Sequence, residues 1–200
     1  MDKVDSTLIG LVLAGGRSRR MGQDKALMLY NGRTLIDHAS SLLRAAGCNE
    51  VFVSRNAPGF LNDQIEDAGP LSGVHAALDK LGNSDSEKHT KLLVLPVDMP
   101  QMTPELLKRL VLVGRERSQA CYVENRFLPF YLPVSQNTKA ILTHYLVDQS
   151  KRRVVGFLEK VNAVCLKAHA FETNRLDNAS HDDEAQWLNV NTPGDWPNEK

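Results

Sequence analysis

The sequence predicts an α/β fold in three layers, in which a mostly parallel β-sheet has helices on both of its faces. Short apolar runs alternate with helical patterns along the first 118 residues, and this alternation is typical of parallel sheets whose crossovers contain helices. Two of the runs, LIGLVLA (8–14) and KLLVLPVD (91–98), are almost continuously apolar. A strand with a solvent-exposed face alternates apolar and polar residues, so these two runs predict strands buried on both faces.

The first part of the chain contains three predicted strands and three predicted helices. We expect strands over 8–14, 50–54 and 91–98, helices over 34–47 and 103–114, and a loop that opens into a helix over 69–82. Thr34 and Thr103 are expected to cap their helices, because a threonine hydroxyl accepts a hydrogen bond from the first turn. Gly47 and Gly114 are expected to end them, because glycine readily takes the left-handed conformation that follows many helices. The polar stretch 83–90 lacks periodicity and predicts a surface connection.

Residues after 118 show a less regular pattern. Segments 119–124 and 127–134 predict a hairpin or a pair of edge strands, because their prolines are unsuited to a central strand. Two helices are expected over 138–149 and 151–161, followed by a strand over 162–167. No internal repeat, low-complexity tract or long linker divides the chain, so the sequence predicts one α/β domain of 200 residues.

The composition limits the classes of partner. Lysine and arginine number 24, as do aspartate and glutamate, so the chain as a whole has no electrostatic attraction to nucleic acid or to an anionic membrane. Three widely spaced cysteines form neither a disulfide framework nor a zinc motif. The apolar stretch near the N-terminus is too short, and too soon interrupted by glycine, for a signal peptide or a membrane span. We therefore expect a soluble cytoplasmic protein.

The loop that follows the first predicted strand combines glycine with strong positive charge. It leaves the carboxyl end of a buried strand, where open parallel sheets bind their ligands. Gly15 and Gly16 have no Cβ, so a ligand can approach the backbone and its N–H groups closely. Four cations follow them: Arg17, Arg19, Arg20 and Lys25. Guanidinium groups match the geometry of phosphate oxygens, and the loop therefore predicts a phosphate site.

Two common phosphate loops do not match this segment. A Walker A loop requires G-x-x-x-x-G-K-[ST], but Gly22 is followed here by Gln23. The dinucleotide fingerprint G-x-G-x-x-G is also absent from AGGRSRRMG. The loop is thus neither a P-loop ATPase signature nor that of a nicotinamide dehydrogenase.

Asp98 is the candidate metal ligand. It follows the apolar run 91–97 and should emerge at the carboxyl end of a central strand. A nucleoside triphosphate is usually handled as its Mg²⁺ complex, which is held by one or two carboxylates together with phosphate oxygens. The alternative is an aspartate in an ordinary turn beside Pro100.

The segment LAGGRSRRMGQDKA (13–26) resembles the signature L-A-G-G-x-S-x-R-M-G-x-D-K-A of the molybdenum cofactor guanylyltransferases. Three further segments resemble elements of the same family in the same order: DAGPLSG (67–73), PVDMP (96–100) and NVNTPGD (189–195). The resemblance spans nearly the whole chain. It implies a Rossmann-like, GT-A-like nucleotidyltransferase fold, with a nucleotide-binding half over 1–118 and an acceptor-binding half over 119–200.

The resemblance also implies an activity and a set of residues. The family transfers GMP from GTP to molybdopterin with Mg²⁺ and releases pyrophosphate, and other molybdenum cofactor proteins are possible transient partners. Lys25, Arg20 and Asp98 are implied as catalytic residues, with Asp98 holding the metal. Asn189 and Asn191 are implied on the molybdopterin side. The implied GTP contacts are Leu13, Ala14, Gly15, Gly16, Lys25, Ser54, Asp67 and Asp98.

Several of these residues have simpler interpretations. Asp67 stands two residues before Gly69-Pro70 and could form a turn. The two asparagines could cap or turn the chain before Thr192. Ser54 stands where the family often has asparagine, with Asn56 two residues later, so the contact that selects the base stays open.

Alternative functions also remain at this point. Related cytidylyl- and sugar-nucleotidyltransferases have similar loops, but they usually contain Ala-Ala-Gly and a proline before the lysine, whereas this chain has Ala14-Gly15-Gly16 and Asp24-Lys25. A nucleotide-binding regulator without turnover is the alternative of a different class. The presence of both Lys25 and Asp98 weighs against it, because a protein that only binds nucleotide has less need of a metal ligand.

Overall fold

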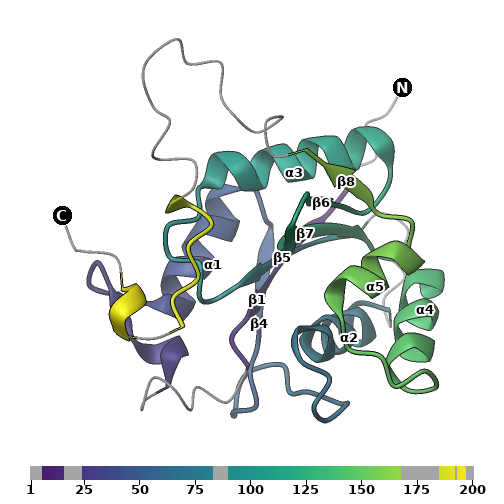
Figure 1. The fold of residues 1–200 in the computed structure, drawn as a ribbon, viewed down its shortest axis with the longest axis horizontal. Coiled ribbons are helices and arrows are strands. Elements are labelled where there is room, and N and C mark those ends of the chain that lie inside the picture. The colour runs from purple at the N-terminus through teal and green to yellow at the C-terminus, as the bar shows by residue number, and fades with distance from the viewer. Residues whose placement is uncertain (1–5, 16–23, 83–89, 168–184, 192, 197–200) are drawn as a thin grey trace.

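The computed structural model describes residues 6–15, 24–82, 90–167, 185–191 and 193–196, and it has the predicted three layers (Figure 1). A six-stranded sheet has the order β4-β1-β5-β7-β6-β8. Its strands are β1 Leu8–Leu13, β4 Glu50–Ser54, β5 Lys91–Pro96, β6 Cys121–Val123, β7 Arg126–Pro133 and β8 Val164–Leu166. Strands β4, β1 and β5 are parallel, β7 is antiparallel to both β5 and β6, and β8 is parallel to β6. The mostly parallel α/β sheet is thus confirmed.

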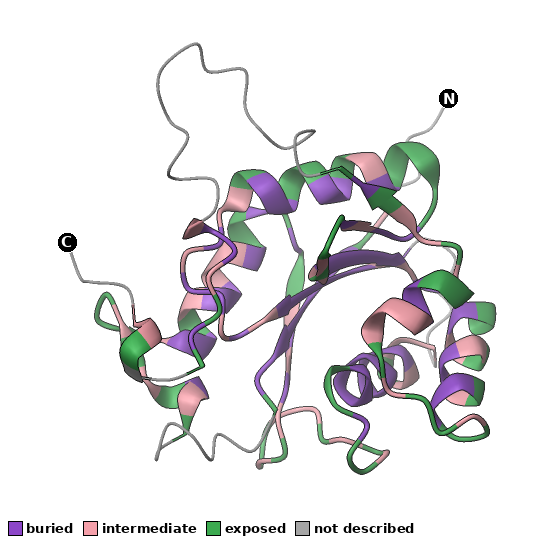
Figure 2. Ribbon diagram, in the orientation of Figure 1, coloured by how far each residue is buried: buried purple, intermediate pink, exposed green. Residues whose placement is uncertain are grey.

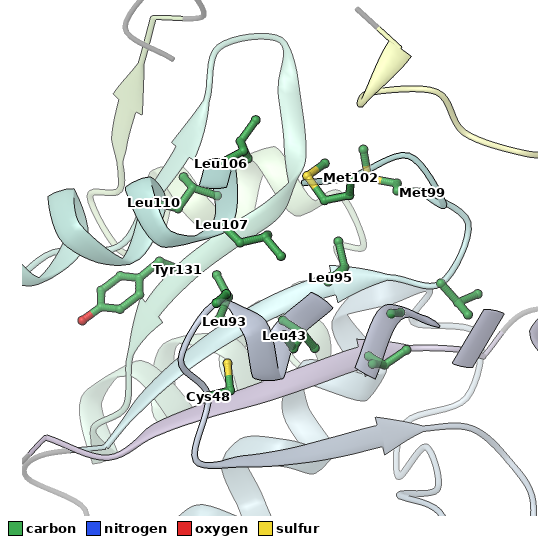
Figure 3. Close-up of a cluster of buried hydrophobic side chains, with 14 of the residues drawn as sticks. Leu43, Cys48, Leu93, Leu95, Met99, Met102, Leu106, Leu107, Leu110 and Tyr131 are labelled. Atoms are coloured by element: carbon green, nitrogen blue, oxygen red, sulfur yellow. The ribbon is translucent and has the colours of Figure 1, made fainter. Parts of the chain in front are cut away.

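Helices cover both faces of the sheet. Helices α1 (Leu35–Ala45) and α3 (Pro104–Arg117) pack on one face, whereas α2 (Pro70–Leu81), α4 (Gln136–Leu146) and α5 (Val154–Lys160) pack on the other (Figure 1). Figure 3 shows the core beneath α1 and α3, where Leu43 and Leu107 approach Leu93 and Leu95 of β5.

Strand β1 is buried along its whole length, as the continuous apolar run predicts (Figure 2). Leu8 and Val12 pack in the cluster beneath α1 and α3, whereas Ile9, Leu11 and Leu13 pack in the cluster beneath α2, α4 and α5. Successive side chains of a strand point to opposite faces, so a strand between two helical layers must be apolar at every position.

The predicted caps of α1 are confirmed, but the predicted end of α3 is wrong. The hydroxyl groups of Thr34 and Thr103 accept hydrogen bonds from the first turns of α1 and α3, and Gly47 has the left-handed φ of 98°. Helix α3 continues past Gly114 to Arg117, and Ser118 takes the left-handed conformation instead. Gly114 is buried within the helix, where its missing side chain allows β7 to lie close.

The predicted hairpin of β6 and β7 is confirmed, but β7 is not an edge strand. It pairs with β5 through residues 130–133 and with β6 on its other side. Pro133 stands at the end of the ladder, opposite Lys91. Pro129 lies where the register between β6 and β7 shifts, so a missing N–H is tolerated there. The prolines therefore limit where β7 pairs, but they do not exclude it from the middle of the sheet.

The other differences between the predicted and the observed elements are smaller. Helix α5 and strand β8 are confirmed with shorter ranges than predicted, and helix α4 is confirmed but begins two residues and ends three residues before the predicted bounds. The connection 83–90 lies outside the described residues except for Thr90. The short helix η1 (Lys25–Leu27) and the two-stranded pair β2 (Leu29–Tyr30) and β3 (Arg33–Thr34) were not predicted. None of the helices in the described ranges is long and apolar enough to cross a membrane.

Candidate nucleotide site

The carboxyl ends of three strands meet at one edge of the sheet. Strand β1 lies between β4 and β5, and Leu13 is in register with Ser54 on one side and with Pro96 on the other. The pairing continues past the strands, because the Ala14 N–H donates to the Ser54 carbonyl at 2.9 Å and the Val97 N–H donates to the Leu13 carbonyl at 3.0 Å. The glycine-containing loop after β1 therefore begins between the ends of two neighbouring strands.

Lys25 and Asp98, 73 residues apart in the chain, come together at this edge. The Lys25 Nζ atom lies 3.4 Å from Asp98 Oδ2 and 3.0 Å from Asn191 Oδ1. The side chains of Lys25 and Asp98 are 13% and 25% exposed, so the ion pair is partly buried but still open to a ligand. A separation of 3.4 Å is long for a charge-assisted hydrogen bond, so this contact is weaker than an ideally placed one.

Residues 189–191, near the C-terminus, are hydrogen-bonded to the chain just after the end of β5. Val190 is fully buried, and its N–H donates to the Asp98 carbonyl at 2.9 Å. Asn189 and Asn191 stand on either side of it and are exposed, and the Asn191 N–H donates to Asp195 Oδ2 at 3.0 Å. The segment is not a strand, but the alternation of buried and exposed residues still leaves both asparagines on the open side.

A second ion pair, between Asp24 and Arg55, lies at the same edge of the sheet and was not predicted from the sequence. The Asp24 carboxylate accepts a hydrogen bond from the Arg55 guanidinium through Oδ2, and its Oδ1 accepts one from the Ala26 N–H at 3.1 Å. An aspartate before a short helix is a recognisable cap, so this part of its role had a signal in the sequence. Arg55 had none, because its partner is 31 residues away.

The loop leading to α2 contains the other predicted nucleotide residues. Ser54 is only 2% exposed, so little of it can contact a ligand, and its carbonyl is taken by Ala14. A Cβ atom on Gly73 would lie 2.3 Å from Ser54 Oγ, which shows how tightly α2 packs against the end of β4. Asp67 is exposed and left-handed, with a φ of 51°. No hydrogen bond or ion pair among the described residues joins Asp67 to Lys25 or Asp98.

The glycine–arginine loop itself is only partly described. Gly15 is exposed, and among the described residues a Cβ atom there would meet only the Ser54 carbonyl oxygen, at 3.9 Å. Gly16, Arg17, Arg19 and Arg20 lie outside the described residues. The predictions made for them therefore stay predictions.

Asp98 stands alone as a candidate metal ligand in the part of the chain that the structure describes. No group of three or more potential metal-ligating histidine, cysteine, aspartate or glutamate side chains occurs among the residues that the structure describes. A single carboxylate at a strand end suits a metal that brings phosphate oxygens and water as its other ligands, which is how Mg²⁺ is usually bound.

Comparison with known proteins gives a consistent result. The family model described as the MobA-like NTP transferase domain matches residues 10–162. The chain is 34% identical to a molybdenum cofactor guanylyltransferase of Xanthomonas euvesicatoria over 94% of this chain and 91% of that protein. It is 31% identical to the enzyme of the same name from Rhizobium johnstonii over 95% and 90% of the two chains.

Solved structures share the fold. Molybdopterin-guanine dinucleotide biosynthesis protein A from Archaeoglobus fulgidus superposes with a TM-score of 0.70 at 22% identity, over 94% of both chains. The complex of Rv0371c from Mycobacterium tuberculosis with manganese superposes with a TM-score of 0.55 at 20% identity, over 92% of this chain and 98% of that one. At these identities the likeness concerns the fold.

Proposed function

The chain belongs to the MobA-like NTP transferase family, and we propose that it is a guanylyltransferase that transfers GMP from GTP to molybdopterin and releases pyrophosphate. The relatives that carry this activity in their names match the chain over nearly its whole length. The single structural observation that supports it most is the cluster of Lys25, Asp98 and Asn191 at the carboxyl ends of β1 and β5.

The chemistry requires charge control more than a general base. The terminal phosphate of molybdopterin already carries about −1.5 to −2 charge at neutral pH, so it is a nucleophile without losing a proton. Its approach to the α-phosphate of GTP is opposed by repulsion between two anions, and negative charge builds up on the departing pyrophosphate. Preorganised cations reduce both costs, and we assign this task to Lys25 and Arg20, with Arg17 and Arg19 nearby in the sequence.

We propose Asp98 as the ligand of Mg²⁺. The metal would polarise phosphate oxygens and orient the triphosphate when bound. The position of Asp98 supports this role, because its partly exposed carboxylate stands beside Lys25 at the open edge of the sheet. The manganese complex of a protein with the same fold is consistent with a divalent metal in this family.

The remaining residues divide between the two substrates in this proposal. Leu13, Ala14, Gly15, Gly16 and Asp67 would contact the nucleotide from the first half of the chain, residues 1–118. The almost fully buried Ser54 would contribute at most a small part of its surface. Asn189 and Asn191 would contact molybdopterin from the second half, residues 119–200. The hydrogen bond from Lys25 to Asn191 brings a residue of each half to the same point, and in this proposal the two substrates would meet there.

We further propose that the enzyme works in the cytoplasm and passes its product to other molybdenum cofactor proteins. Cys48, Cys121 and Cys165 are all free thiols, which fits a reducing compartment.

The deciding experiment is incubation of the purified protein with molybdopterin, Mg²⁺ and one nucleoside triphosphate at a time. We expect pyrophosphate release and the dinucleotide form of the pterin with GTP, and neither with CTP or ATP. Turnover with CTP would favour the cytidylyltransferase alternative. Binding of GTP without pyrophosphate release would favour a regulator, and no binding of any nucleotide would contradict the proposal altogether.

A further inference from the structure

The glycine–arginine loop (residues 14–25) is bonded at both of its described ends to two consecutive residues, Ser54 and Arg55. At the start of the loop, the Ala14 N–H donates to the carbonyl of Ser54 at 2.9 Å. At its end, the Asp24 carboxylate pairs with the guanidinium of Arg55. The end of β4 therefore holds the loop at both sides, through a backbone bond at one and a side-chain ion pair at the other.

Arg55 is itself well fixed. Its N–H donates to the Leu61 carbonyl and its own carbonyl accepts from the Ala57 N–H, both at 2.8 Å. Its guanidinium lies 5.6 Å from the centre of the Phe60 ring, and its side chain is only 17% exposed. A guanidinium that is already held over an aromatic ring loses less conformational entropy when it binds a carboxylate.

The ion pair between Arg55 and Asp24 lies directly beside Lys25 in the chain, because Asp24 is the preceding residue. Asp24 caps the short helix η1 by accepting from the Ala26 N–H, and Ala26 is buried at 1% exposure. Lys25 stands between these two anchored residues, so the position of its backbone depends on them. Its Nζ atom is the group that reaches Asp98 and Asn191.

The pair also has an electrostatic consequence. Asp24 is 44% exposed and directly precedes Lys25, so an unpaired Asp24 carboxylate would repel an incoming triphosphate. Arg55 compensates this charge and holds the carboxylate in the direction that caps η1. Loss of Arg55 would therefore remove an anchor and expose a negative charge beside the phosphate site.

We propose that Arg55 is a positioning residue for the nucleotide, which acts through Asp24 to hold Lys25 and to neutralise the carboxylate beside the triphosphate. The proposal rests on the nucleotide site proposed above. It requires Arg55 to affect the binding of the nucleoside triphosphate and to leave the binding of the acceptor unchanged.

The test uses the full-length protein with Mg²⁺ and the triphosphate that the wild type binds most tightly among GTP, CTP and ATP. We expect Arg55→Ala to weaken binding in calorimetric titration about tenfold and to raise the KM for that nucleotide similarly, with the KM for molybdopterin unchanged. Arg55→Lys keeps the charge without the fork and should recover part of the loss. Arg117→Ala removes the same charge from the exposed end of α3 and should leave every value unchanged.

A second substitution separates this role from a merely structural one. Asp24→Asn keeps an oxygen for the Ala26 N–H but removes the negative charge, so Arg55→Ala with Asp24→Asn should bind nucleotide more tightly than Arg55→Ala alone. Additive losses in the double variant, or wild-type nucleotide affinity in a folded Arg55→Ala protein, would overturn the proposal for Arg55 while the nucleotide site stood. A wild type that binds none of the three triphosphates would overturn both.

Discussion

Asp98 is held through its backbone, while its carboxylate lies at the open edge of the sheet, where we propose that it binds Mg²⁺. Its backbone carbonyl accepts from Val190 and fixes the residue, whereas its side chain is partly exposed beside Lys25. A residue that is fixed through its backbone can lose its side-chain charge without loss of the fold. The substitution of Asp98 therefore tests chemistry rather than stability.

We expect Asp98→Asn to lower kcat/KM for guanylyl transfer by at least about a hundredfold, because a preorganised electrostatic group at the reacting phosphates is lost. The melting temperature should stay close to that of the wild type. Asp148→Asn, which changes an exposed aspartate that follows α4, is the matched control and should keep full activity. Asp98→Asn protein with wild-type turnover would contradict the metal role.

The three cysteines differ in burial, and we expect them to differ in reactivity for that reason. Burial raises the pKa of Cys48 and of Cys121 to about 12, because a thiolate in an apolar interior is not solvated. Cys165 is exposed. We expect Ellman's reagent at pH 8 to titrate one thiol in the folded protein and three in denaturant, and Cys165→Ser should remove the fast phase. Two fast thiols in the native protein would contradict this assignment.

At the scale of elements, the helix ends show what a sequence pattern could and could not decide. The caps at Thr34 and Thr103 were predictable because they depend on residues three positions away. The end of α3 was not predictable, because a glycine can either end a helix or allow a close contact within it. Gly114 has the second role, since it lies against Tyr131 of β7, and no local sequence pattern reveals that contact. The position of β7 was missed for the same reason, since its pairing with β5 joins distant segments.

The close contact between Gly114 of α3 and Tyr131 of β7 gives a prediction about stability. A Cβ atom on Gly114 would lie 2.1 Å from Tyr131 Cδ1, so Gly114→Ala should lower the free energy of unfolding by about 1–3 kcal/mol despite the better helix propensity of alanine. Ser118→Gly, four residues later in the left-handed position with a φ of 52°, should raise it by about 0.5–1 kcal/mol. Urea unfolding of both variants measures these changes, and a stabilised Gly114→Ala protein would disprove the packing argument.

The contact between α2 and α4 gives a pH dependence. His75 of α2 is buried, and its Nε2 atom lies 3.1 Å from Thr143 Oγ1 of α4. Burial lowers the pKa of His75, which outweighs the opposing effect of Asp79, while Lys139 lowers the pKa further. Because the unfolded chain then binds a proton more readily than the folded one, stability should be fully present above the unfolded pKa of about 6.5 and should fall as the pH drops below it.

We expect the free energy of unfolding, measured in urea between pH 5 and pH 8, to decline below about pH 6.5 in the wild type. His75→Gln should flatten this decline, because the group that takes up the proton only on unfolding is gone. His144→Gln is the matched control, since His144 is exposed and pairs with Asp148. An unchanged pH slope in His75→Gln would assign the effect to other groups.

At the scale of the whole molecule, the sheet explains why the sequence could predict that Lys25 and Asp98 lie close together. A loop after one buried strand and an aspartate after another must reach the same edge of a parallel sheet, so the approach of Lys25 to Asp98 followed from strand order. The Asn191 contact with Lys25 spans 166 residues and could be expected only from the family resemblance. The pairing of Arg55 with Asp24 could be expected from neither, because it depends on side-chain directions at the end of β4.

The same edge of the sheet should connect nucleotide binding to the stability of the whole fold. The candidate site joins β1, β5, η1 and the segment at Asn191, so a ligand that bridges them binds only the folded chain. At a concentration of about one hundred times its Kd, such a ligand stabilises a protein by about 2.7 kcal/mol. For a domain of this size we expect Mg²⁺ with GTP to raise the melting temperature by about 5–10 °C.

EDTA should reduce this increase in the wild type but change it little in Asp98→Asn, because that variant has lost the metal ligand. CTP should give a much smaller increase, and equal stabilisation by all triphosphates would place the selection of the base outside the binding step.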